Sequence, residues 1–231
     1  MIFRQLFERE SSTYTYLIGC EETREAALID TVKSELDNYV KLLAELDLKL
    51  VYIVDTHTHA DHITAAGALQ TLTGATTLLG EQAHSFCVSK ALHDGDEIKV
   101  GNITINAIHT PGHTDDSYCF TLKDQNETYA FTGDTLLIRG TGRTDFQNGN
   151  AAQQYQSLMQ KLLTLPDNTW VYPAHDYKGW MRSTIREEKM YNPRLQATTE
   201  AAYVDIMDKL KLPNPALMDI AVPANRSCGN G

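Results

Sequence analysis

The chain has 231 residues and a formal net charge of -10, with 42% hydrophobic and 22% charged residues. This is the balance of a globular protein long enough to bury a sizeable core. An acidic chain repels phosphate backbones, and no run of Lys and Arg offsets the charge, so we expect no nucleic-acid partner.

No stretch approaches the ~20 apolar residues of a membrane span, so we expect no membrane partner either. The first twelve residues, MIFRQLFERESS, lack the basic and apolar regions of a signal peptide. A cytoplasmic location is the default expectation. The four cysteines (Cys20, Cys87, Cys119 and Cys228) form no CxxC pair, and we expect four reduced, mostly buried thiols.

Strand-like and helix-like segments alternate from the N-terminus. Aromatic and β-branched residues at 13–18 and 25–30 predict two paired strands. The spacing of apolar residues predicts an amphipathic helix over 34–46, and a continuous apolar run predicts a buried strand over 48–54. The expected apolar stripe of the helix consists of Leu36, Val40, Leu43 and Leu46.

A second helix is expected after residues 56–62, with Ala65, Leu69 and Leu72 in register and Gly74 as its C-cap. The turn Gly101-Asn102 predicts a hairpin of strands 97–100 and 103–108.

The remaining elements continue the alternation. We expect, in order, a strand at 129–132, a helix at 151–163 ended by Pro166, a strand at 170–172, mainly helices from Trp180 to Leu212, and an irregular tail. No linker or repeat interrupts the sequence. The prediction is one α/β domain over residues 1–231, with a short helical C-terminal extension from about residue 180.

Four polar clusters each follow a predicted strand, at residues 57–62, 109–113, 133–135 and 174–177. In layered α/β folds, ligands collect at strand ends, where several loops converge. This arrangement suits a metal site assembled from distant parts of the chain.

The first cluster, THTHADH, places His57, His59, Asp61 and His62 within six residues. Imidazole and carboxylate groups are ligands for zinc, iron, copper and nickel. A solvent-exposed loop rarely carries three histidines and an aspartate at HxHxDH spacing, so we favour a metal site.

Three further residues extend the candidate set. His113 follows the turn Pro111-Gly112, Asp134 follows Gly133, and His175 lies in YPAHDY. Each residue alone has an ordinary structural explanation, such as a turn or a hydrogen-bonded core position. Their order after HxHxDH makes coincidence a poor explanation.

This series of motifs resembles the signature of the metallo-β-lactamase superfamily. The resemblance implies an αββα sandwich, with two mixed β-sheets flanked by helices and the metal site at one edge. The set of candidate ligands also permits a site with two metals. His57, His59 and His113 would bind one metal, Asp61, His62 and His175 would bind the other, and Asp134 would bridge them. Such a site activates water, as in glyoxalase II, a thioester hydrolase acting on S-lactoylglutathione.

Other segments resemble the persulfide dioxygenases instead. They are TGDTLLIRGTGRTDFQNGN (132–150), YPAHDYKGW (172–180), NPRL (192–195) and VPAN (222–225). The resemblance implies one Fe(II) per chain, held by His57, His113 and Asp134 with positions left open for substrate and O₂. His59, Asp61, His62 and His175 would then orient these ligands through hydrogen bonds.

The same resemblance implies oxidation of glutathione persulfide by O₂ to sulfite and glutathione, in persulfide detoxification. Arg143, Tyr177 and Arg194 occupy positions that resemble the glutathione-contacting residues of this family. Arginine offers a bidentate fork for the carboxylates of glutathione. The sequence does not determine the oligomeric state, and a homodimer stays open.

Overall fold

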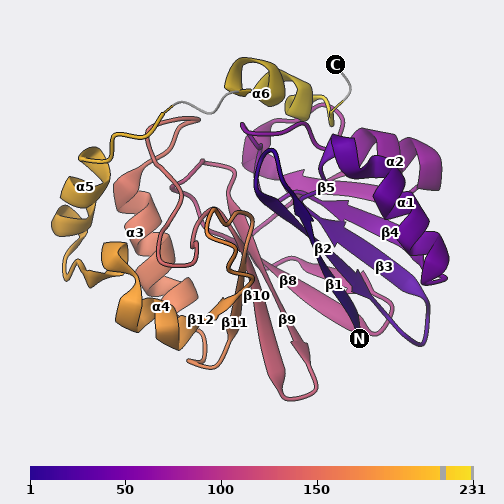
Figure 1. Ribbon diagram of the computed structural model, residues 1–231, viewed down its shortest axis with the longest axis horizontal. Coiled ribbons are helices and arrows are strands. Elements are labelled where there is room, and N and C mark those ends of the chain that lie inside the picture. The colour runs from indigo at the N-terminus through magenta and orange to yellow at the C-terminus, as the bar shows by residue number, and fades with distance from the viewer. Residues whose placement is uncertain (214–216, 230–231) are drawn as a thin grey trace.

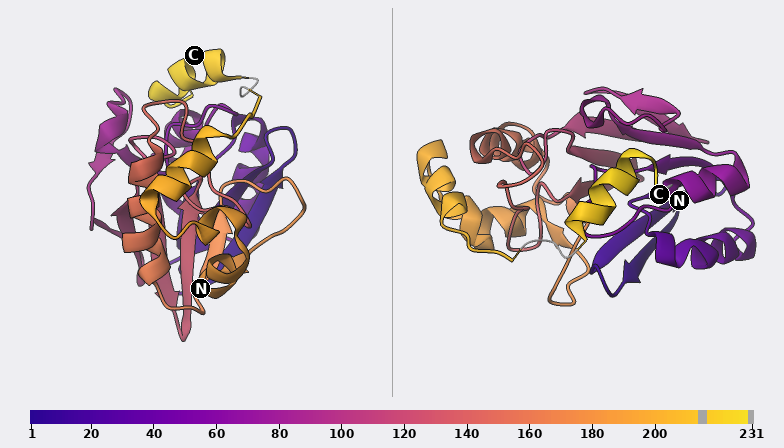
Figure 2. Two further views of the ribbon diagram at one scale, coloured as in Figure 1. Left: turned by 90° about the vertical axis from the view of Figure 1, so that its left-hand side faces the viewer. Right: turned by 90° about the horizontal axis from the view of Figure 1, so that it is seen from above.

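The computed structural model describes residues 1–213 and 217–229 as two β-sheets stacked face to face, with helices on both outer faces (Figure 1). The expected αββα sandwich is therefore confirmed. Figure 2, viewed from above, shows the layers in sequence from helices through two sheets to helices.

The first sheet has the order β1-β2-β3-β4-β5-β6, and the second has the order β12-β11-β10-β9-β8-β7. The strands of the first are Ile2–Glu8, Thr13–Gly19, Glu25–Ile29, Lys49–Val54, Thr76–Gly80 and Lys90–Leu92. Those of the second, β7 to β12, are Glu97–Val100, Ile103–His109, Tyr118–Asp124, Glu127–Gly133, Trp170–Pro173 and Ser183–Thr184. Both sheets are mixed, since β3 to β6 run parallel, as do β10 and β11.

The helices cover the outer faces as their apolar stripes require. On the first sheet lie α1 (Leu36–Glu45) and α2 (Ala66–Thr73); on the second lie α3 (Ala151–Gln160), α4 (Ile185–Tyr191) and α5 (Glu200–Asp208). A sixth helix, α6 (Met218–Arg226), lies across the edge of the sandwich (Figures 1 and 2). Short 3₁₀ turns occupy Lys33–Glu35, Glu81–Ala83, Leu162–Thr164 and Pro193–Gln196.

The inner faces of the two sheets enclose an aromatic-rich core. Phe131 and Tyr16 come from opposite sheets, and their ring centroids lie 5.0 Å apart. Tyr172 packs edge-on against Tyr16 at 5.6 Å. Burial of these large rings is a main stabilising term for the sandwich and fixes how the sheets stack.

Several predicted elements are confirmed. The strands predicted at 13–18 and 25–30 pair antiparallel, and β7 and β8 form the expected hairpin, with Val100 opposite Ile103. Gly74 ends α2 in the left-handed conformation, with a φ of 72°.

Other predictions were wrong. Leu72 was placed in the apolar register of α2, but its side chain is exposed. Strands β1, β5, β6 and β9 were not predicted, and β12 interrupts the region expected to be helical. The tail was expected to be irregular, yet α6 forms there around Pro223, because its residues Ala221 and Ala224 are buried. Residues 214–216 and 230–231 of that tail lie outside the described residues.

The expectation of four reduced thiols was also wrong. Cys87 and Cys228 form a disulfide, while Cys20 and Cys119 are free and buried. The paired cysteines are 141 residues apart in sequence, so only the docking of α6 brings them together. Within residues 1–213 and 217–229, every helix is too short or too polar to cross a membrane.

Candidate metal centre

The loops after four strands converge at one edge of the sandwich. His57 follows β4, His113 follows β8, Asp134 follows β10 and His175 follows β11. The strands carry these loops to the same edge because the sheets fix where each strand ends (Figure 1). The four predicted polar clusters therefore contribute to one site.

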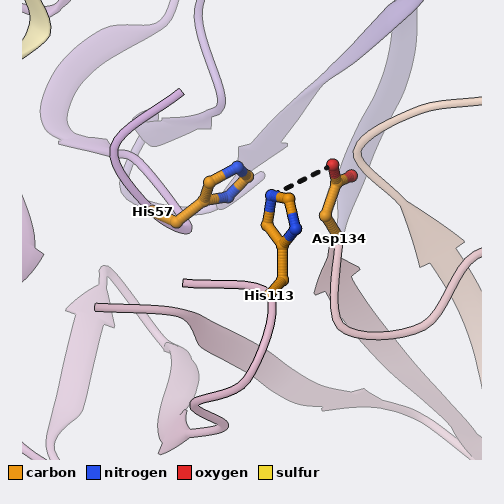
Figure 3. Close-up of side chains that lie close together, drawn as sticks. All are labelled: His57, His113 and Asp134. Atoms are coloured by element: carbon orange, nitrogen blue, oxygen red, sulfur yellow. Dashed lines mark ion pairs between the residues drawn. The ribbon is translucent and has the colours of Figure 1, made fainter. Parts of the chain in front are cut away.

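His57, His113 and Asp134 form one group of potential metal donors. One ligand atom from each lies within 4.8 Å of the others. Figure 3 shows the two imidazole rings and the carboxylate facing a common space, and His113 Nε2 lies 3.5 Å from Asp134 Oδ2. Two imidazoles and one carboxylate are the donor set that suits non-haem Fe(II) and leaves positions for other ligands.

Hydrogen bonds orient both imidazoles for metal binding. Thr56 Oγ1 donates to Asp30 Oδ2 at 3.1 Å, so its oxygen accepts from His57 Nδ1 at 2.9 Å. His113 Nδ1 donates to the carbonyl oxygen of Arg143 at 2.7 Å. Both rings therefore keep the lone pair on Nε2 for a metal, and this tautomer follows from the partners of Nδ1.

Gly133 lets β10 approach the loop that carries His57. A Cβ atom at Gly133 would lie 2.8 Å from Thr56 Oγ1, and the residue has a φ of +50°. Both the contact and the left-handed backbone favour glycine. Gly133 therefore allows Asp134 to lie beside the loop that carries His57.

A second group of donors lies beside the first. His59, Asp61 and His62 also bring one ligand atom each within 4.8 Å. His59 Nδ1 and His62 Nε2 are buried and have no hydrogen-bond partner among the described residues. His59 Nε2 lies 3.1 Å from Asp30 Oδ1. Burial acts to lower the pKa of His59, but Asp30, together with Asp61 and Asp55, raises this pKa to about 9.

His175 connects the two groups. Its Nδ1 lies 2.7 Å from Asp134 Oδ1, and its Nε2 lies 2.8 Å from Asp61 Oδ2. Burial acts to lower the pKa of His175, but the two carboxylates raise it well above its usual range. Burial likewise acts to raise the pKa of Asp61 and of Asp134, and His175 lowers both.

A cavity of about 530 Å³ opens beside this cluster, and His113, Asp134 and His175 form part of its wall. Four cationic side chains (Arg139, Arg143, Lys178 and Arg194) and four acidic ones (Glu10, Asp61, Asp134 and Asp176) line it. Arg139 and Arg143 share one loop, whereas Lys178 and Arg194 come from two later segments; sequence reasoning missed Arg139 and Lys178. The four cations offer partners for an anionic substrate.

The three predicted substrate-contacting residues all line the cavity. Arg143 pairs with Asp145 through two nitrogens at 2.7 Å and donates to the Pro213 carbonyl at 2.6 Å. Arg194 donates to the Thr141 hydroxyl at 3.0 Å. Tyr177 is exposed, and its ring stacks on His175 at 6.1 Å.

Sequence reasoning also missed two residues, Asp30 and Thr13, that form hydrogen bonds with the cluster or its loop. Asp30 accepts from the backbone NH of Thr56 at 2.7 Å as well as from its hydroxyl. Thr13 Oγ1 lies 3.1 Å from His175 Nε2. A buried aspartate directly after an apolar strand was the available signal for Asp30, whereas Thr13 had none.

Comparison with known proteins agrees with this geometry. Residues 9–190 match the metallo-beta-lactamase superfamily. The chain is 46% identical to the mitochondrial persulfide dioxygenase ETHE1 of Mus musculus over 229 residues, or 99% of this chain and 89% of that protein.

A solved structure is similar over the full chain. The crystal structure of ETHE1 from Myxococcus xanthus is 54% identical, with a TM-score of 0.95, and the match covers 99% of this chain and 100% of that one. A probable hydroxyacylglutathione hydrolase of Schizosaccharomyces pombe is 40% identical over 166 residues, covering 71% of this chain and 64% of that protein. The chain therefore belongs to the metallo-β-lactamase superfamily and, within it, to the persulfide dioxygenases.

Proposed function

We propose that this enzyme oxidises glutathione persulfide with O₂ and water, giving sulfite and glutathione, in persulfide detoxification. The observation that carries the proposal is the His57, His113 and Asp134 group beside a cavity whose wall includes the two arginines Arg143 and Arg194. The relatives that match the whole chain are named persulfide dioxygenases, which supports the same substrate class.

The donor set fits one Fe(II) held by His57, His113 and Asp134, since its rings present Nε2 and its carboxylate is ionised. Bound there, iron would supply the redox chemistry that O₂ needs and a soft binding position for a sulfur anion. The chain itself positions the ligands, because Thr56 and the Arg143 carbonyl fix the two rings.

His59, Asp61, His62 and His175 are proposed to support the metal ligands without binding iron. Both ring nitrogens of His175 contact carboxylates, so neither nitrogen has a lone pair free to bind a metal in this arrangement. Its contact with Asp134 restrains the carboxylate that would hold iron. Such contacts commonly tune affinity and ligand orientation.

The cavity is proposed to hold the glutathione portion. Glutathione carries two carboxylates, and Arg143 and Arg194 are the cations proposed to meet them. Arg143 pairs with Asp145 in the structure, so a substrate carboxylate would replace Asp145 as its partner. Tyr177 would contact the glutathione backbone near the metal. Because the chain is acidic overall, these local cations determine how the anionic substrate is held.

A dinuclear thioester hydrolase of the glyoxalase II type is the second candidate. The donors of His59, Asp61 and His62 lie within 4.8 Å of one another, which is compatible with a second metal. The matching hydrolase, however, shares fewer residues and covers only 71% of this chain. We therefore do not favour this activity.

The cellular location, the oligomeric state and the partners of the protein are predictions. We propose a cytoplasmic location, although the mouse relative is named as mitochondrial. A homodimer, and the lack of nucleic-acid and membrane partners, are likewise expectations from the sequence.

The function is tested by metal analysis of anaerobically purified protein, combined with assays on two substrates. We expect about one iron per chain, O₂ uptake with glutathione persulfide and no hydrolysis of S-lactoylglutathione. Two tightly bound zinc ions with thioesterase activity would instead identify the hydrolase.

A further inference from the structure

The C-terminal helix α6 reaches the metal-binding loop through one side chain. Asn225 is 5% exposed, and its Nδ2 donates to the carbonyl oxygens of His59 at 2.9 Å and His62 at 2.8 Å. Its Oδ1 accepts from the backbone NH of Thr64 at 2.9 Å. One amide group therefore binds the loop backbone at three places.

These three hydrogen bonds satisfy backbone groups that would be paired with other backbone groups in a helix or a strand. Residues 55–63 form neither helix nor strand, although they contain the whole HxHxDH motif, and its three histidines are buried. Buried carbonyl and NH groups in such a loop need partners from outside it. Asn225 meets that need at His59, His62 and Thr64, and so restrains the loop along most of its second half.

The segment that carries Asn225 is itself attached firmly. Gly67 donates its backbone NH to the carbonyl of Cys228 at 2.9 Å, and Cys228 is joined to Cys87 by the disulfide. Gly229 lies so close that a Cβ atom there would be 2.0 Å from the Thr64 carbonyl oxygen. These contacts with α2 and the loop leave Asn225 little freedom to move.

We infer that Asn225 is a positioning residue for the metal centre, which sets the backbone of the HxHxDH loop and thereby holds His57 in place for the metal. Asn225 contacts neither metal nor substrate in this account. The inference rests on the proposed function in one respect, the assignment of His57 as a ligand. It does not depend on which substrate the metal centre oxidises.

A matched pair of variants separates positioning from general stability. Asn192 is also buried, and its amide donates to the carbonyl of Gly140 at 2.9 Å and accepts from the NH of Arg194 at 3.1 Å. It therefore has the same chemistry on the backbone of Gly140 and Arg194, neither of which is a proposed metal ligand. We would compare Asn225→Ser with Asn192→Ser, and Asn225→Leu with Asn192→Leu.

Two readouts report the metal centre without persulfide turnover. One is the rate at which a chelator removes Fe(II) from anaerobically loaded protein, and the other is the visible absorption spectrum of the Co(II)-loaded protein. Loss of an outer contact to a metal site commonly weakens metal binding by ~10–100-fold. We expect Fe(II) release at least about ten-fold faster in Asn225→Ser, with a changed Co(II) spectrum. Asn192→Ser should retain the wild-type Fe(II) release rate and Co(II) spectrum, although its melting temperature should fall about as much as that of Asn225→Ser.

Unchanged release and spectrum in Asn225→Ser would overturn the inference, as would equal changes in Asn192→Ser. The serine variants decide the result if either leucine variant fails to fold. If the wild-type protein binds metal but does not oxidise persulfide, the proposed function fails. The inference about Asn225 would still stand or fall on the release rates alone.

Discussion

His175 Nδ1 lies 2.7 Å from Asp134 Oδ1, while the other oxygen of Asp134, Oδ2, lies 3.5 Å from His113 Nε2. The carboxylate is therefore shared between a hydrogen bond on one oxygen and the proposed metal centre on the other. This division gives His113 and His175 different roles, although the sequence presents both as histidines at strand ends.

Replacement of His113 and His175 should separate these roles. His113→Ala should abolish both iron binding and O₂ consumption, because it removes one of three proposed ligands. His175→Ala should retain much of the iron and lose activity by ~10–100-fold, the usual cost of an outer partner. Iron and O₂ uptake are measured in the same preparations. Complete iron loss in both variants would make His175 a direct ligand.

Arg143→Ala should weaken substrate binding more than it slows catalysis. A charge-assisted contact to a carboxylate remote from the reacting sulfur stabilises ground and transition states alike, so KM should rise about ten-fold or more with a smaller fall in kcat. Iron content should not change, because the backbone carbonyl that orients His113 remains.

Asp145→Asn is the matched control for this prediction. It breaks the same ion pair as Arg143→Ala but leaves the guanidinium in the cavity. KM should then stay near the wild-type value. Equal KM values for the two variants would assign Arg143 a structural role.

Gly133→Ala should damage both stability and iron binding. The new methyl group would meet Thr56 Oγ1 at 2.8 Å, and the residue has a φ of +50°, so the hydroxyl that orients His57 must move. Gly74→Ala is the control, because Gly74 has a φ of +72° and no atom of the described residues lies within 4 Å of the new Cβ. Both variants bear a backbone cost of ~1–2 kcal/mol, but only Gly133→Ala should lose iron. Normal iron content in Gly133→Ala would show that Thr56 does not restrain His57.

Reduction of the Cys87–Cys228 disulfide should lower the melting temperature. A cross-link between residues 141 apart restricts the unfolded chain, and such bonds typically contribute ~2–4 kcal/mol. A Cys87→Ser variant should show the lowered value and no further response to reductant. If reductant does not change the melting temperature of the wild-type protein, the disulfide makes no contribution to stability.

The sequence predicts which polar clusters lie together better than it predicts the borders of the fold. Strong periodicity and turn chemistry identify α1, α3 and the β7–β8 hairpin, because those signals are local. The metal motif is also local in part, since HxHxDH stands within six residues. Its remaining members follow predicted strands, and parallel strands bring such positions together.

What the sequence did not predict depends on contacts between distant segments. Asn225 and His59 are 166 residues apart, and Cys87 and Cys228 are 141 apart, so no pattern along the chain relates them. Helix α6 contains Pro223, which argues against a helix locally. The helix forms nonetheless, with Ala221, Ala224 and Asn225 buried, because tertiary contacts outweigh local propensity.

The most direct test of the proposed reaction is its stoichiometry. Oxidation of one glutathione persulfide by one O₂ and one water gives one sulfite and one glutathione, in which the terminal sulfur gains the oxygen and the S–S bond breaks. Anaerobically purified, iron-loaded protein should therefore consume O₂ and form sulfite in a 1:1 ratio when glutathione persulfide is supplied. Persulfide loss without O₂ consumption, or O₂ consumption without sulfite, would contradict the account.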